Sequence, residues 1–319
     1  MSETIAHYPK VTIVGAGNVG ATTALLLLLK GIADVVMIDV ALGIAKGKAL
    51  DLMHMRSNEL FGPRVIGTGD YEDTAASDLV VITAGIPRKP GMTREDLISV
   101  NAGIANSVME AALPVSPDAV FIIVTNPLDV LTNLLRQRYD VLPSRLIGMG
   151  GVLDTARFSA AIAEETGADP AQIEALVVGA HGEAMVPLPS LARVKGQPLL
   201  SLVDQAALQR ILAATVDGGA AVVRLLETGS AFYAPAASIV MMVEAILGNT
   251  GACLSCCSYL QGEYGISDIS LCVPTVLGLE GVRQIVELPL APAELQQLQA
   301  SAESVKVQVE SAQRSFSQG

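Results

Sequence analysis

The stretch Lys10-Val-Thr-Ile-Val-Gly15-Ala16-Gly17-Asn18-Val19-Gly20 decides the fold class of this chain. Its β-branched first part predicts a buried strand, and the apolar residues 21–30 after it predict a helix. Between them the glycines follow the pattern Gly-x-Gly-x-x-Gly, and Asp39 follows Gly20 by nineteen residues, at the end of the next predicted strand. A glycine turn placed in this way predicts a dinucleotide-binding unit, whereas the same turn alone would be a weak signal.

Each glycine of this stretch has a physical role in such a unit. Gly15 permits the tight turn, Gly17 lets the backbone approach a pyrophosphate, and Gly20 allows the helix to pack closely on the strand. The first turn of the helix offers unpaired N–H groups to the anion. The residues expected to contact the cofactor here are Gly15, Ala16, Gly17, Asn18, Val19 and Gly20.

Asp39 points to the kind of dinucleotide. A carboxylate at this position accepts hydrogen bonds from the ribose hydroxyls of the adenosine, and its charge repels a 2′-phosphate. We therefore expect NAD rather than NADP as the cofactor.

Outward from this stretch, predicted strands alternate with predicted helices. The strands cover residues 34–40, 79–84 and 120–125, and the helices cover residues 44–56 and 94–113. This alternation predicts an α/β fold with a Rossmann-type, doubly wound parallel sheet. The composition shifts near residue 148, so we expect a dinucleotide-binding domain over residues 1–148 and a mixed α+β substrate domain over residues 149–319.

Composition excludes several classes of function. The 319 residues are 51% hydrophobic and carry 20 Lys and Arg against 32 Asp and Glu, a net charge of −12. A chain this apolar is not disordered, and its longest basic run is Arg88-Lys89, so we expect no nucleic-acid partner. Residues 11–29 lack charges, but glycines and threonines interrupt them, so we expect a cytoplasmic protein without a membrane span.

The four cysteines fall within one strand-like stretch, at Cys253, Cys256, Cys257 and Cys272. A zinc site would need more ligands than these cysteines and the three histidines of the chain provide at a suitable spacing. We expect no metal, and we interpret the cysteines as small buried side chains in a reducing compartment, with redox sensing as the alternative.

Histidine is the residue type most suited to proton transfer near neutral pH. His7 lies in the N-terminal tail and His54 in a predicted helix, whereas His181 follows an apolar strand and lies between Gly179 and Gly182. Strand ends are where sites form in such sheets, although a lone histidine is more often structural.

Asp154 and Arg157 are three residues apart on a predicted helix, so they share one of its faces. Alone they would form an ordinary ion pair. Beside His181, Asp154 could fix the tautomer of the imidazole, and Arg157 would be free to bind a substrate carboxylate.

Five motifs in order resemble the lactate/malate dehydrogenase family over nearly the whole chain, and most closely its lactate-dehydrogenase-like malate branch. The branch also has a counterpart of residues 229–237. The motifs are the glycine stretch, Pro-Arg-Lys-Pro-Gly-Met-Thr-Arg at residues 87–94, Thr-Asn-Pro-Leu-Asp at 125–129, Leu-Asp-Thr-Ala-Arg at 153–157 and Gly-Ala-His-Gly at 179–182.

The resemblance implies roles for individual residues. His181 matches the catalytic histidine, Asp154 the carboxylate that orients it, and Arg157 the arginine that binds the C1 carboxylate. Arg94 matches an arginine on a closing lid that polarises the reacting carbonyl. Arg88 matches the residue that selects the substrate, because malate enzymes have arginine there and lactate enzymes usually have glutamine.

The resemblance also implies that Asn126 contacts both substrate and nicotinamide, and that Val124 and Asn101 contact the cofactor. Two positions depart from the family, Glu183 where aspartate is usual and Ser190 where related malate enzymes often have arginine. These departures affect expectations about rate and assembly, not about the class of reaction.

The implied activity is the reversible oxidation of (S)-malate to oxaloacetate with NAD, a reaction of the tricarboxylic acid cycle, in a homo-dimer or homo-tetramer. A lactate or broad 2-hydroxyacid dehydrogenase is the alternative within the family. An NAD-dependent glycosidase and a non-catalytic NAD-binding protein are alternatives from other classes.

Overall fold

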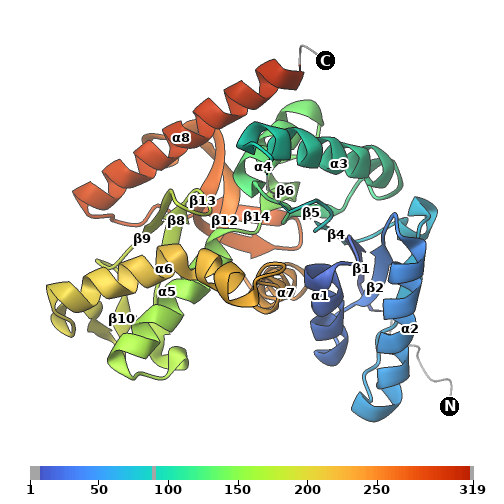
Figure 1. The fold of residues 1–319 in the computed structure, drawn as a ribbon, viewed down its shortest axis with the longest axis horizontal. Coiled ribbons are helices and arrows are strands. Elements are labelled where there is room, and N and C mark those ends of the chain that lie inside the picture. Colours follow the sequence, from blue (N-terminus) through green and yellow to red (C-terminus); the bar gives the residue numbers. More distant parts are fainter. Residues whose placement is uncertain (1–7, 88–90, 317–319) are drawn as a thin grey trace.

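The computed structural model describes residues 8–87 and 91–316, with side chains up to residue 314 (Figure 1). Its first half is a parallel sheet in the order β3-β2-β1-β4-β5-β6, which confirms the predicted doubly wound fold. The strands are β1 Lys10–Val14, β2 Asp34–Ile38, β3 Val65–Thr68, β4 Leu79–Ile82, β5 Val120–Ile123 and β6 Leu146–Gly148. The strand order reverses between β1 and β4, and the crevice outside their carboxyl ends is where ligands bind in such sheets.

Helices cover both faces of the parallel sheet. α1 (Asn18–Leu29) and α2 (Leu42–Glu59) share one apolar core with the sheet, and α3 (Arg94–Val115) and α4 (Leu128–Arg138) share another. The strands are buried on both faces, which explains why they consist of continuous apolar runs rather than alternating ones.

The second half extends the same sheet with antiparallel strands. β12 joins β6 where Cys257 pairs with Gly148, and the order continues through β13, β8 and β9, with β14 also on β13. These strands are β8 Val177–Gly179, β9 Met185–Pro187, β12 Cys253–Gln261, β13 Ser267–Gly278 and β14 Gly281–Ile285. A small separate sheet contains β7 Ile173–Glu174, β10 Arg193–Val194 and β11 Gln197–Pro198.

Four further helices complete this half, α5 Gly151–Thr166, α6 Gln205–Leu226, α7 Tyr233–Leu247 and α8 Pro292–Phe316. α7 lies beside α1, so the two halves share a core (Figure 1). α8 buries Leu298, Ala302, Val305 and Val309 against β8, β13 and α4, so the apolar stripe of the C-terminal sequence packs on the body of the molecule.

β3 is a strand that the sequence patterns do not predict. Its sequence Val-Ile-Gly-Thr is short, and a glycine normally weakens a strand. Here Gly67 is required, because a Cβ at this position would lie 2.2 Å from the carbonyl oxygen of Ala45 in α2. Gly67 makes β3 hard to predict from the sequence, and the same glycine allows α2 to pack on this strand.

The uncharged residues 11–29 are divided between β1 and α1. Among the helices of the described ranges, α6 alone is long and apolar enough to cross a membrane by length and composition. One such helix is weak evidence for a membrane span, because the core helix of a soluble protein passes the same test. α6 packs Ala207, Ile211 and Thr215 into the protein, and its Arg210 pairs with Glu165 of α5.

Candidate active site

His181 and Asp154 meet where the two halves of the molecule join. His181 follows the end of β8 by two residues, and Asp154 lies in the first turn of α5. Nδ1 of His181 lies 2.8 Å from Oδ2 of Asp154, and the aspartate side chain is only 1% exposed against 14% for the histidine. The structure therefore brings together the pair that the sequence predicts, with Nε2 left for a ligand.

Several charges act on the imidazole. Burial by itself lowers the pKa of His181, but the charge of Asp154, its hydrogen bond and the charge of Asp129 raise it, whereas Arg157 lowers it. The net pKa lies above the usual 6.5. The raised pKa favours the protonated imidazole, which can donate a proton as a general acid and recover it as a base.

Arg157 joins the same group through Asp154. Its Nη1 donates to Oδ1 of Asp154 over 3.2 Å, so the two oxygens of one carboxylate serve the histidine and the arginine separately. The arginine lies against α6, where a Cβ at Gly218 would be 3.2 Å from its Cδ and a Cβ at Gly219 would be 3.2 Å from its Nη2.

The sequence analysis missed these two glycines. Glycine inside a helix costs about 1 kcal/mol relative to alanine, so two in succession are a signal that something lies close to the helix.

The glycine loop fits a dinucleotide. Gly15 has φ +107°, and a Cβ there would lie 2.7 Å from Oγ1 of Thr83, whereas a Cβ at Gly20 would lie 2.0 Å from the carbonyl oxygen of Gly15. Nothing lies within 4 Å of a Cβ built at Gly17, and no side chain caps the N-terminus of α1. The N-terminus of α1 thus has no side-chain cap and faces open space at Gly17, which suits a pyrophosphate.

The carboxylate of Asp39 is hydrogen-bonded to the backbone of the glycine loop. Its Oδ2 accepts the N–H of Ala16 over 2.8 Å, and its Oδ1 accepts the N–H of Ala41 over the same distance. Lys48 of α2, which the sequence analysis did not single out, donates from Nζ to the carbonyl oxygen of Ala16 over 2.7 Å. A carboxylate and an ammonium group therefore flank the turn.

Asn101 and Asn126 are neighbours at the carboxyl ends of β4 and β5. Nδ2 of Asn101 donates to the carbonyl oxygens of Asn126 and Ile86, and its Oδ1 accepts the N–H of Ile86. Asn101 is buried and connects these two loops, whereas Asn126 is exposed and Val124, just before it, is half-buried.

The predicted substrate arginines differ in what can be said of them. Arg88 lies outside the described residues. Arg94 is the exposed first residue of α3, where Thr93 and Asp96 form a capping box, so the helix begins at the residue that the sequence predicts. It lines a small cavity together with Gln308 of α8, and no hydrogen bond or ion pair joins it to His181 in the described part of the chain.

The structure shows what the two residues that depart from the family contact. Glu183 is exposed beside a groove between α6 and α8. Ser190 donates from Oγ to Oε2 of Glu294 over 2.5 Å, and Glu294 also accepts the N–H of Ala291. Ser190 thus holds the start of α8.

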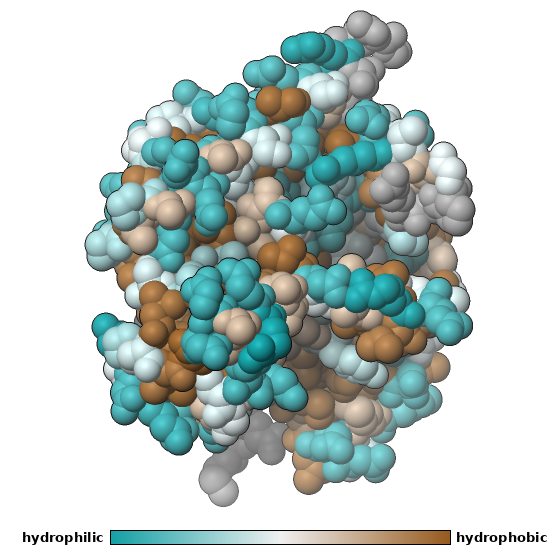
Figure 2. Space-filling view, turned by 60° about the vertical axis from the view of Figure 1, so that its left-hand side comes forward, coloured by the Kyte–Doolittle hydropathy of each residue, from teal (hydrophilic) through white to brown (hydrophobic). Residues whose placement is uncertain are grey.

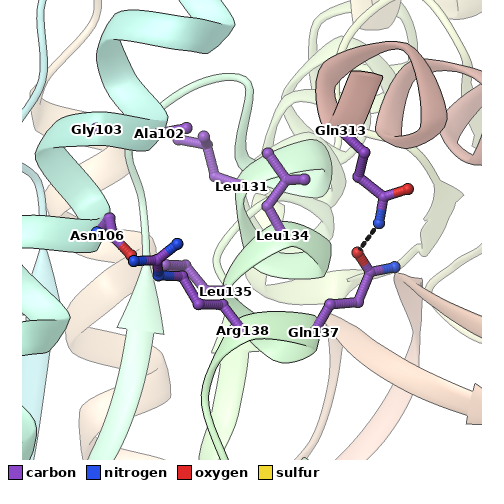
Figure 3. Close-up of a pocket in the computed structure, with 9 residues that line it drawn as sticks. All are labelled: Ala102, Gly103, Asn106, Leu131, Leu134, Leu135, Gln137, Arg138 and Gln313. Carbon is purple, nitrogen blue, oxygen red and sulfur yellow. Dashed lines mark hydrogen bonds between the residues drawn. The ribbon is translucent and has the colours of Figure 1, made fainter. Parts of the chain in front are cut away.

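A cavity of about 490 Å³ lies elsewhere, between α3, α4 and the end of α8 (Figure 3). Figure 3 shows the hydrogen bond from Gln313 to Gln137 along one side of the cavity, with leucines of α4 beside it. None of the predicted site residues lines it, so its size does not make it the active site.

Comparison with known proteins identifies the family. Residues 9–148 match the NAD-binding domain of lactate/malate dehydrogenase, and residues 151–315 match the α/β C-terminal domain of the same enzymes. The chain belongs to the lactate/malate dehydrogenase family. It is accordingly an NAD-dependent oxidoreductase.

Several relatives cover almost the whole chain. A malate dehydrogenase of Nostoc punctiforme is 48% identical over 96% of this chain and 94% of its own length. The structure of a malate dehydrogenase from Salinibacter ruber has a TM-score of 0.93 and 41% identity, covering 97% of this chain and 99% of that one. A lactate dehydrogenase from Cryptosporidium parvum, complexed with lactic acid and NAD, has a TM-score of 0.93 and 37% identity over the same shares.

Proposed function

We propose that this family member is a malate dehydrogenase, which interconverts (S)-malate and oxaloacetate. The observation that carries the proposal is the carboxylate of Asp154, which binds His181 through one oxygen and Arg157 through the other. This arrangement holds a proton-transfer group and a carboxylate-binding group at fixed separation, as a 2-hydroxyacid requires. The identity of the relatives, malate dehydrogenases at 46–48%, supports the choice of malate.

We assign the proton transfer to His181. In oxidation, its neutral Nε2 accepts the proton of the substrate hydroxyl while Asp154 holds the proton on Nδ1 and stabilises the imidazolium that forms. In reduction, the protonated ring returns this proton. NAD, when bound, supplies the nicotinamide that accepts or donates the hydride.

We assign substrate recognition to three arginines and an asparagine. Arg157 binds the C1 carboxylate, Arg94 stabilises the charge that develops on the reacting oxygen, and Arg88 binds the distal carboxylate as a bidentate partner. To Asn126, after the end of β5, we assign contacts with both substrate and nicotinamide. Arg94 is the first residue of α3, and we propose that it acts from a lid that closes over the substrate.

We assign cofactor binding to residues 1–148 and the catalytic group to residues 149–319. The cofactor residues are Gly15, Ala16, Gly17, Asn18, Val19, Gly20, Asp39, Asn101, Val124 and Asn126. For Asn101 we propose an indirect contribution, because its amide is already bonded to Ile86 and Asn126.

Consumption of NADH with oxaloacetate and with pyruvate, in parallel, tests the substrate. We expect a strong preference for oxaloacetate, because its distal carboxylate would pair with Arg88, whereas pyruvate has no distal carboxylate to make this ion pair. Arg88→Gln should lower kcat/KM for oxaloacetate about a hundredfold or more, since it leaves that carboxylate unpaired, and should spare pyruvate. Arg210→Gln, which removes an exposed guanidinium on α6, is the matched control and should change neither value.

Preference of the unmodified protein for pyruvate would contradict the substrate assignment but keep the reaction class. Equal losses for both substrates in Arg88→Gln would mean that another group binds the distal carboxylate.

We further propose that the chain forms a homo-dimer or homo-tetramer and works in the cytoplasm, in the tricarboxylic acid cycle. α6 and α7 expose large apolar side chains, and Figure 2 shows brown apolar patches between the polar ones on one face of the molecule. These side chains are Val216, Val223, Leu225, Leu226, Tyr233 and Met241. Light scattering of the eluting protein would give the mass, and a monomer would contradict the assembly.

A further inference from the structure

Behind His181 lies a buried carboxylate to which the proposed reaction assigns no role. Asp129 is in the first turn of α4 and is 5% exposed. Its Oδ2 accepts the backbone N–H of His181 over 2.8 Å. The catalytic histidine therefore has a carboxylate on its ring, Asp154, and a second one on its main chain.

Burying the charged carboxylate of Asp129 to accept the backbone N–H of His181 costs free energy. Burial raises the pKa of Asp129 to about 6, even though the charge of His181 and its backbone N–H act to lower it. The amide oxygen of an asparagine could accept the same N–H without the cost of burying a charge. Because fixing the backbone needs only an acceptor, the negative charge calls for a different explanation.

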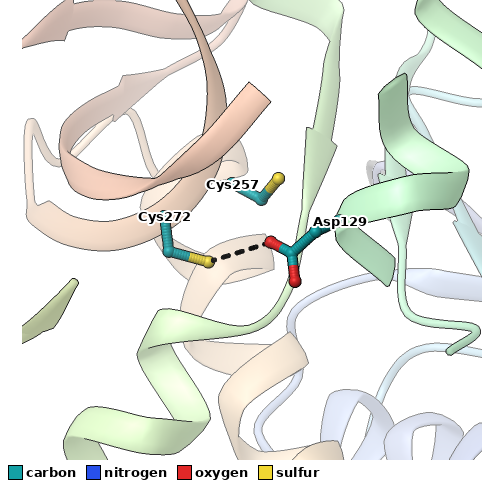
Figure 4. A group of neighbouring side chains, drawn as sticks. All are labelled: Asp129, Cys257 and Cys272. Atoms are coloured by element: carbon teal, nitrogen blue, oxygen red, sulfur yellow. Dashed lines mark hydrogen bonds between the residues drawn. The ribbon is translucent and has the colours of Figure 1, made fainter. Parts of the chain in front are cut away.

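The same carboxylate is linked to the helix that carries Asp154. Sγ of Cys272 lies 4.0 Å from Oδ1 of Asp129 and accepts the N–H of Gly151 over 3.2 Å (Figure 4). Gly151 is the first residue of α5, three residues before Asp154. Asp129 is thus connected to His181 on one side and, through Cys272, to the support of Asp154 on the other.

The packing around this link is tight. A Cβ at Gly150 would lie 3.0 Å from Sγ of Cys272 and 3.1 Å from Cβ of His181. Cys257, directly across the strand pair from Cys272, closes the cluster. A substitution of Asp129 or Cys272 would therefore alter contacts with the backbone at His181 and at the start of α5.

A metal site is the other way to explain these residues, because the ligand atoms of Asp129, Cys257 and Cys272 lie within 4.8 Å of one another. Two observations oppose it. One carboxylate oxygen is already bonded to His181, and burial raises the pKa of Cys257 well above its usual value, whereas a metal requires thiolates. The cluster is better suited to supporting the histidine.

We propose that Asp129 is a positioning residue for proton transfer at His181, which fixes the histidine backbone through its hydrogen bond and stabilises the imidazolium through its charge. This inference rests on the proposed function. It assigns the buried cysteine Cys272 a role as well, as the contact between Asp129 and α5.

The sign of the effect follows from the groups that face His181. Asp154 and Arg157 face it from α5, and Asp129 faces it from α4, while Cys257, Cys272 and Asp154 surround Asp129. The charge of Asp129 raises the pKa of His181, so removing that charge lowers it.

The test compares Asp129→Asn with Asp140→Asn, an exposed position just after α4 that gives the same change in net charge. Because the chain has three histidines, ¹⁵N spectra follow the His181 titration directly, with assignment by His7→Gln and His54→Gln. In Asp129→Asn we expect the pKa of His181 to fall by about half a unit or more. The alkaline limb of kcat/KM for oxaloacetate should move by the same amount, with NADH affinity within twofold.

An unchanged His181 titration in a folded Asp129→Asn would overturn the inference, and so would an equal shift in Asp140→Asn. If Asp129→Asn does not fold, Cys272→Ala takes its place: kcat should fall at least twofold with NADH affinity unchanged, and an unchanged kcat overturns the inference. Absence of activity in the unmodified protein would instead refute the proposed function, and the spectra would still test the role of Asp129.

Discussion

The glycine loop and the His181 group, the two regions that we propose bind ligands, are built in opposite ways. The loop is a continuous segment, residues 15–20, that offers backbone N–H groups and the space left by absent side chains. The His181 group comes from α4, α5 and the segment after β8, packs against α6, and acts through side chains separated by as many as 52 positions in sequence, from Asp129 to His181.

This difference determines how each region tolerates change. In the loop, a methyl group added at Gly15 or at Gly20 would lie 2.7 Å or less from a neighbouring atom, whereas loss of any one side chain matters less. In the His181 group, Asp154 bonds to His181 and Arg157, and Asp129 accepts the backbone N–H of His181, so removing one of these carboxylates leaves a buried polar group unpaired. Substitutions in the two regions should therefore separate cofactor binding from chemistry.

The largest effect should come from His181→Ala. Loss of the proton-transfer group lowers kcat about a thousandfold or more, while NADH affinity stays within a few-fold because the loop is untouched. His54→Ala, an exposed histidine on α2, is the matched control and should leave kcat unchanged. Stopped-flow turnover and calorimetric binding of NADH measure the two quantities. A His181→Ala protein that keeps a tenth of the activity would refute the assignment.

The opposite pattern is expected of Gly20→Ala. The new Cβ would meet the carbonyl oxygen of Gly15 at 2.0 Å, so the loop must shift, and we expect NADH affinity to fall about tenfold or more with a stability loss of about 1–3 kcal/mol. Gly43→Ala, at a helix position with nothing within 4 Å of the new Cβ, is the control. Normal NADH binding by Gly20→Ala would contradict the expectation that this steric conflict shifts the loop.

Sequence patterns predict the loop far better than the His181 group, for a physical reason. The loop is local, so spacing alone reveals Gly15, Gly17, Gly20 and Asp39, and the fold follows from the strand and helix around them. Elimination and helical spacing single out His181, Asp154 and Arg157 and suggest a role for each, and the resemblance to a family implies the same roles. Nothing in the spacing indicates that they meet.

The supports of the catalytic group were not predictable at all. Asp129 was simply part of a motif, and Gly219 was one of 29 glycines in the chain. Each gains its meaning from a contact with a residue distant in sequence, His181 in one case and Arg157 in the other. Lys48 likewise becomes informative only when α2 packs beside the glycine loop.

A smaller effect should follow from Gly219→Ala. A Cβ here would approach Nη2 of Arg157 to 3.2 Å, so the guanidinium must give way, and we expect KM for oxaloacetate to rise about three- to tenfold. Alanine also suits a helix better than glycine, by up to about 1 kcal/mol, so the melting temperature should not fall. Gly47→Ala on α2 gives the same helix gain with open space around it. Equal KM values in both variants would contradict the role of the glycine pair.

The smallest effect, a few-fold, concerns pH and reaches only the His181 group. Because Asp154 and Asp129 raise the pKa of His181 above 6.5 despite burial, the ring stays protonated to higher pH than a free histidine. Reduction of oxaloacetate uses the protonated ring, so its kcat/KM should fall as pH rises through that pKa, whereas malate oxidation should rise over the same interval. NADH affinity should stay level, since the loop binds through backbone. If NADH affinity followed the same curve as kcat/KM, the two regions would not be independent.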